Sequence, residues 1–130
     1  MDNFVRIPTI SVNSDFQSIF TFEQFETNDV NGMIISDRIN AENFRLRKSL
    51  PGYKTDFHIA GDPTLILVQQ GQIKITVNSG NSMTFSQGDL FIAKDYLPKE
   101  IDFNADVHGH SAEVVGTTPF VAVHIKLGYL

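Results

Sequence analysis

The sequence contains no cysteine among its 130 residues. The chain therefore forms no disulfide, holds no zinc–thiolate site and offers no thiolate nucleophile. It also lacks an apolar run long enough to cross a membrane as a helix. Its first residues show no basic segment followed by an apolar stretch, so we expect no signal peptide. From these absences we expect a cytoplasmic protein with no membrane partner.

Basic residues are also few, with 10 Lys and Arg against 15 Asp and Glu and a formal net charge of -5. Non-specific nucleic-acid binding requires a basic face, so we expect no nucleic-acid partner. The one basic cluster is Arg45, Arg47 and Lys48. Arg45 and Arg47 share one face of any strand there, which we interpret as a solvated face and not as a phosphate site. No phosphate loop, nucleophile elbow or dinucleotide fingerprint is present.

The sequence is rich in short stretches that alternate polar and apolar residues. Residues 72–78 alternate without a break, and residues 43–47 do the same. Such alternation is typical of half-buried antiparallel strands, and turns such as Gly61-Asp62-Pro63 separate the stretches. Segment 16–25 is the one place where a short helix competes. The predicted strands are residues 32–39, 43–50, 54–60, 64–70, 72–78, 82–85, 89–93, 99–103, 111–115 and 120–127.

Many short strands with regular turns predict an all-β sandwich or barrel. The chain has the length of one ordinary domain. It contains no linker, low-complexity segment or convincing repeat. We therefore expect a single domain over residues 1–130.

Several glycines and one histidine occur at spacings that point to a family. Gly52 opens the first stretch, His58 follows after five intervening residues, and Gly71 closes the stretch; Gly88-Asp89 begins a second one. This pattern resembles the two motifs of the cupin family. The resemblance implies a jelly-roll β-barrel (a double-stranded β-helix) with its motif-bearing core at about 51–103. It also implies a pocket for a small-molecule ligand and a homodimer.

The resemblance also bears on metal binding, because cupins ordinarily hold a metal through His-x-His, a glutamate and a later histidine. His58 matches the first ligand, whereas Ala60 and Thr64 occupy the positions of the next two. Lys99 occupies the last position at strict spacing, and a longer turn brings His110 there instead. The resemblance therefore implies a chain without the usual metal centre and with no cofactor. A divalent metal held by His58 and His110 is the alternative.

Two other histidines are interpreted as structural or surface residues. His108 forms a His-x-His string with His110, but too little chain follows for this string to serve as a first motif. We interpret it as a surface loop, with a metal ligand at His108 as the alternative. His124 shares a face with Ala122 and Lys126 in the last predicted strand, so we expect it outside the barrel or at an interface. The opposite, apolar face consists of Val121, Val123, Ile125 and Leu127.

A candidate binding site follows from the faces of two predicted strands. Residues two apart on a strand point the same way, so Asp56 and His58 share a face that the resemblance makes the inward one. Thr64, Ile66 and Val68 would point inward from the next strand. We predict a metal-free site in which His58 is a general base or hydrogen-bond donor and Asp56 orients it.

Two residues after the second motif complete this hypothetical site. Lys99 would neutralise an anionic ligand or a developing oxyanion, and Tyr96 would supply a phenol as an acid. Catalysis would then rest on His58, Lys99 and Tyr96. The alternative is that His58 is a core histidine satisfied by hydrogen bonds, with Lys99 paired to Asp56 or Glu100.

The sequence leaves several functions open, including whether the protein is an enzyme. The first is a small-molecule-binding protein without catalysis. The second is a metal-free isomerase, epimerase or lyase that uses His58 for acid–base chemistry. The third is a metal-dependent oxygenase or isomerase, and the fourth is a structural or partner-binding domain. The ligand itself is not encoded in any motif.

Overall fold

The computed structural model describes residues 3–130 as ten β-strands, with no helix among those residues. Met1 and Asp2 lie outside the described residues, so the expectation about a signal peptide falls partly outside them. No helix within residues 3–130 is long and apolar enough to cross a membrane. The strands are β1 Phe4–Val12, β2 Ser18–Val30, β3 Met33–Ser36, β4 Ala41–Ser49, β5 Thr64–Gln70, β6 Gln72–Val77, β7 Ser82–Ser86, β8 Leu90–Ala93, β9 His110–Val115 and β10 Phe120–Leu127.

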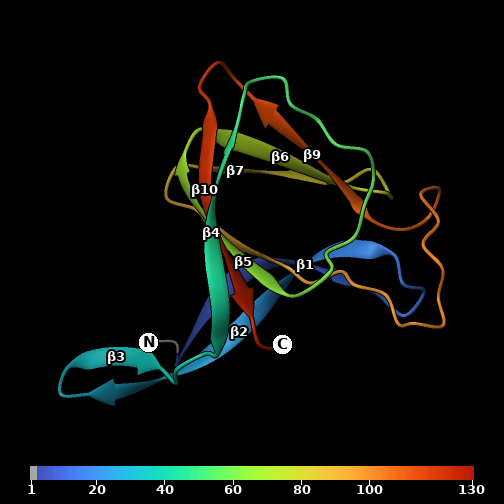
Figure 1. Ribbon diagram of the computed structural model, residues 1–130. Coiled ribbons are helices and arrows are strands. Elements are labelled where there is room, and N and C mark those ends of the chain that lie inside the picture. Colours follow the sequence, from blue (N-terminus) through green and yellow to red (C-terminus); the bar gives the residue numbers. More distant parts are fainter. Residues whose placement is uncertain (1–2) are drawn as a thin grey trace.

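The strands form two sheets (Figure 1). The larger sheet has seven strands in the order β3-β2-β1-β8-β5-β10-β4, and the smaller has three in the order β7-β6-β9. All pairings are antiparallel except the short parallel contact between β1 and β8. The prediction of an all-β jelly roll is confirmed by this arrangement.

The hydrophobic core lies between the two sheets. Ile73, Ile75 and Val77 point into it from β6 at every second position, as the alternation of residues 72–78 predicts. They face buried side chains from the larger sheet, among them Ile66 on β5 and Phe120 on β10. This core fixes which face of each strand points inward, and so it decides which polar side chains reach the interior.

Some predicted strands are wrong. Residues 54–60 make only two isolated bridges, at Lys54 and His58, and residues 99–103 form a loop. In contrast, β1 was not predicted, and β2 covers most of the segment for which a short helix competed. Pro8 and a mixture of polar and apolar residues obscure the period of β1, which is stabilised by continuous pairing with β2.

The orientation expected for the last strand is reversed. Ala122 is fully buried in the core, whereas Val121, Val123 and Ile125 are only partly buried. His124 therefore faces the interior, and its expected place outside the barrel is wrong. The polar His124 points into a cavity, so the polarity of β10 by itself selects the wrong face as the inner one.

Candidate functional site

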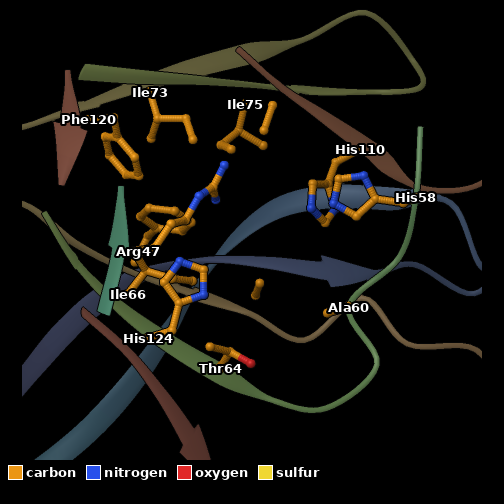
Figure 2. A pocket seen from close by; sticks show the side chains of 13 residues that line it. Arg47, His58, Ala60, Thr64, Ile66, Ile73, Ile75, His110, Phe120 and His124 are labelled. Atoms are coloured by element: carbon orange, nitrogen blue, oxygen red, sulfur yellow. The ribbon is translucent and has the colours of Figure 1, made fainter. Parts of the chain in front are cut away.

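A cavity of about 150 Å³ lies between the two sheets (Figure 2). Its walls are mainly apolar, and polar side chains enter it from β4, β5, β9, β10 and the loop that precedes β5. The residues that line it are Arg47, His58, Ala60, Thr64, Ile66, Ile73, Ile75, Phe91, Ala93, His110, Ala112, Phe120 and His124.

His58 and His110 form a pair at one side of the cavity. Their backbones exchange two hydrogen bonds, His58 N to His110 O at 2.9 Å and His110 N to His58 O at 2.8 Å. Their imidazole rings are tilted, with centroids 4.5 Å apart. His58 is solvent-exposed and His110 is buried, so the pair connects the cavity to the surface. The two histidines are far apart in the sequence, and only the tertiary structure brings them together.

Asp95 orients the imidazole ring of His110 through a hydrogen bond to its Nδ1. This aspartate has no solvent exposure, and its Oδ2 lies 2.6 Å from His110 Nδ1 and accepts a hydrogen bond from Ser18 Oγ at 2.6 Å. Its Oδ1 accepts a hydrogen bond from the backbone N–H of Ala60 at 3.1 Å. A buried carboxylate is tolerated only when its oxygens are satisfied in this way. Asp95 therefore fixes the ring of His110 in the cavity wall.

The hydrogen bonds also fix which nitrogen of each paired histidine carries a proton. His58 Nδ1 lies 2.9 Å from the backbone carbonyl of Asp56, which can only accept, so Nδ1 is the donor. His110 Nδ1 donates in the same way to the carboxylate of Asp95. When neutral, both rings thus keep Nε2 as a hydrogen-bond acceptor.

Arg47 enters the cavity from β4, on a different side from the histidine pair (Figure 2). Its guanidinium lies 5.4 Å from the ring centroids of both Tyr53 and Phe120, at cation–π distance. Its Nε donates a hydrogen bond to Ser49 Oγ at 3.0 Å. Burial lowers the pKa of Arg47, partly offset by Tyr53, but an arginine stays charged at neutral pH. The interpretation of this arginine as part of a solvated face is therefore wrong.

His124 enters the cavity from β10, beside Arg47. Burial first, and then the charges of Arg47 and Arg45, lower the pKa of His124 to about 4, so the ring is neutral at neutral pH. Its Nε2 is buried and has no hydrogen-bond partner among the described residues. Such an orphaned polar atom is rare in folded proteins and is expected to bind something that the protein itself does not supply.

The structure brings together some of the predicted site residues. His58, Thr64 and Ile66 line the cavity together with His110. Val68 is buried in the core but does not line the cavity.

Three other predicted residues lie elsewhere. The exposed Asp56 orients His58 through its backbone carbonyl and not through its carboxylate. Tyr96 and Lys99 lie on the exposed loop after β8 and are not among the lining residues. The cavity therefore contains neither of the two residues expected to act with His58. His58 itself is exposed, unlike a core histidine.

Sequence reasoning missed Asp95, Arg47 and His124. Asp95 lies two residues after the end of β8 and has the sequence context of a turn residue. It becomes a buried acceptor only through its tertiary contacts with Ser18 and Ala60. The alternation of β4 does place Arg45 and Arg47 on one face. A charged residue is rarely assigned to the interior without a known partner, so the pattern by itself favoured the solvent side.

His108 is a buried residue that lies outside the cavity. Its Nδ1 accepts a hydrogen bond from the backbone N–H of Asn104 at 3.0 Å, and Asn78 Nδ2 donates to its carbonyl at 3.1 Å. Gly109 has a φ of +91°, which interrupts the extended backbone between His108 and His110. The two histidines consequently do not converge, and His108 does not line the cavity.

The donors in the cavity do not fit the usual metal centre of the family that the sequence resembles. A mononuclear site requires at least three protein ligands that converge on one point. Within residues 3–130 no group of three His, Cys, Asp or Glu side chains is placed to hold a metal ion. The imidazoles of His58 and His110 supply only two possible metal ligands. The carboxylate of Asp95 is hydrogen-bonded to His110 Nδ1.

Comparisons with known proteins add little at the sequence level, because no family model and no curated protein matches the chain. Several solved structures resemble it. Protein NMB1881 from Neisseria meningitidis shares 14% identity at a TM-score of 0.44, covering 76% of this chain and 99% of that one. The Cnp3 cupin domain from Schizosaccharomyces pombe shares 11% identity at a TM-score of 0.46, covering 98% and 88%. The fold assignment rests on the strand topology described above.

Proposed function

We propose that this chain binds a small organic molecule in the cavity between its two sheets. The observation that carries the proposal is the cavity of about 150 Å³, whose apolar walls are interrupted by a few convergent polar side chains. This combination is typical of small-molecule sites. An apolar cavity of ~150 Å³ accepts benzene. The ligand is therefore expected to be small, with about six to ten non-hydrogen atoms.

Filling the cavity tests this proposal. Ala112 lies on the cavity wall, so Ala112→Leu places additional carbon atoms inside an existing space. We expect fragments of the size given above to raise the melting temperature of the wild type and to lose this effect in Ala112→Leu. Ala105→Leu, on an exposed loop, adds the same atoms outside the cavity and serves as the matched control. Fragments that bind Ala112→Leu as well as the wild type, or a screen without any binder, would contradict the proposal.

The histidine pair favours a second candidate, a metal-free acid–base enzyme. The supporting observation is the buried Asp95–His110 hydrogen bond of 2.6 Å, which directs one acceptor nitrogen of the imidazole away from the carboxylate. A carboxylate–imidazole pair of this kind supports general base catalysis when a substrate proton lies within reach. In this candidate His110 is the base. His58, which the sequence analysis predicted as the general base, is a second proton acceptor next to it.

Hydrogen–deuterium exchange of a bound ligand distinguishes the enzyme from a simple binding protein. A base that removes a carbon-bound proton exchanges it for deuterium in heavy water, which proton NMR detects as a loss of signal. We expect this loss with the wild type and its absence with His110→Gln, at unchanged ligand binding. His108→Gln, a buried histidine outside the cavity, is the control. If the wild type binds a ligand with acidic C–H protons but leaves them unexchanged, the catalytic candidate is wrong.

A further inference from the structure

We propose that the Arg47 side of the cavity is a subsite for the carboxylate of a small, otherwise apolar organic acid. This inference rests on the proposed function, because it names the chemical class of the ligand that the cavity holds. Arg47 and His124 carry it, together with the absence of any carboxylate among the side chains that line the cavity.

The charge of Arg47 has no counterion in the cavity. No Asp or Glu is found among the lining residues, and among residues 3–130 no ion pair involves this guanidinium. Its one hydrogen bond to a described residue uses Nε, which leaves the terminal nitrogens available. Partly burying an unpaired cation costs free energy, so the site favours a ligand that supplies the negative charge.

The register of β4 and β10 places the second donor next to Arg47. Arg47 pairs with Ala122, and Arg45 pairs with His124, in the antiparallel ladder of the two strands. Arg47 and His124 are therefore diagonal neighbours on the inward face, within reach of a shared ligand. Figure 2 shows both side chains entering the same part of the cavity. A carboxylate bound there can accept a hydrogen bond from the guanidinium and another from His124 Nε2, the orphaned atom.

Packing around Arg47 holds the guanidinium ready for a planar anion. Tyr53 and Phe120 both lie at 5.4 Å from it, and the bond to Ser49 fixes its Nε. A guanidinium held in place loses less entropy for each hydrogen bond it forms, and its fork matches the two oxygens of a carboxylate. With one such fork and a small volume, the site suits a monocarboxylate better than a phosphate ester, which requires more donors.

The remaining walls define the rest of the ligand. Beyond Arg47 and His124, the cavity is bounded mainly by apolar side chains of both sheets, such as Ile66, Ile73 and Ile75, and its other polar lining residues are Thr64 and the histidine pair. The apolar side chains favour an apolar body on the acid. The expected ligand is therefore a short branched or aromatic carboxylic acid in its ionised form.

Pairs of probes that share one shape and differ in charge test the inference. The probes are benzoate and 3-methylbutanoate, each compared with its uncharged amide of the same shape, with dissociation constants from NMR titration of the labelled full chain. We expect the wild type to bind the acids on the order of tenfold or more tighter than the amides, because hydrogen bonds to a charged group are stronger than those to a neutral one. Arg47→Met should reduce this preference to less than about threefold.

Matched variants separate a local effect from general charge. Lys48→Met removes one positive charge from the outer face of the same strand and should keep the preference for the acids. His124→Leu should weaken the acids more than the amides, and it decides the question if Arg47→Met does not fold. Equal binding of acid and amide by the wild type, or a preference retained in Arg47→Met and His124→Leu, overturns the carboxylate subsite alone. If neither acid nor amide binds, the proposed function fails with it.

Discussion

Single side chains give the two sides of the cavity opposite hydrogen-bonding characters. On one side, Asp95 and the carbonyl of Asp56 fix the Nδ1 protons of His110 and His58, so the neutral rings present acceptors. On the other side, Arg47 presents donors and disfavours a second positive charge on His124. The carboxylate of the proposed organic acid therefore belongs on the Arg47 side of the cavity.

The protonation of His124 gives a pH prediction at the same scale. Its pKa of about 4 in the folded protein is below the ~6.5 of an unfolded chain. Above pH ~6.5 both states are neutral and the residue has no effect on stability. As the pH falls towards 4, only the unfolded state takes up the proton, so the folded state loses stability. His124→Gln should therefore lose less stability than the wild type between pH 7 and 4.5 in urea unfolding series.

The acidic and basic groups nearest to His124 are unchanged in that comparison. Arg45, Arg47, Asp62 and Lys126 border the ring or the adjacent surface hollow, and all four are present in both proteins. Parallel stability profiles for the two proteins would show that His124 has an ordinary pKa. Proton NMR of the ring should give a midpoint near the folded value directly.

At the scale of elements, the start of β9 joins the two histidines. Gly109 precedes β9, and its φ of +91° lets the chain turn into the strand at His110. A Cβ at Gly109 would lie 2.7 Å from the carbonyl oxygen of His58, closer than real Cβ atoms approach backbone. The bridge between His58 and His110 therefore depends on a glycine at this position.

Gly109→Ala tests this dependence. Gly88 has the same φ of +91°, but a Cβ there would have no atom within 4 Å, so Gly88→Ala is a matched control. Both variants place an alanine in an unfavourable backbone region, which costs roughly 1–2 kcal/mol. Gly109→Ala should cost at least about 1 kcal/mol more, because the backbone of His58 must move. If both variants lose the same free energy of unfolding in denaturant, the backbones of Gly109 and His58 separate without cost, which would contradict the prediction.

At the scale of the whole molecule, the cavity lies between two sheets, one of seven strands and one of three. The larger sheet contributes Arg47, His124 and Thr64, and the smaller contributes His110. β4, which carries Arg47, is an edge strand of the larger sheet, and the outward Phe44 and Leu46 are 69% and 71% exposed.

The homodimer implied by the family resemblance stays a prediction, as does the cytoplasmic location.

Local sequence determined the strands that have one clear inner face. The alternation in residues 72–78 predicts β6 and its buried Ile73, Ile75 and Val77 because one polar and one apolar side follow from period two alone. The same reasoning failed at β10, where His124 faces inward and the apolar Val121, Val123 and Ile125 lie on the other face. It also failed at residues 54–60, which alternate like a strand but make only isolated bridges.

The sequence by itself thus determined the all-β class, and its resemblance to a jelly-roll family predicted that His58, Thr64 and Ile66 point inward, where they line the cavity. Only the tertiary structure decided that Arg47 and His124 point inward, and that Asp95 contacts His110. The physical reason is that an inward charge is compatible with folding only when distant segments provide its partners. Ser18, Ala60 and His110 surround Asp95 from three separate parts of the chain, and no local pattern records that convergence.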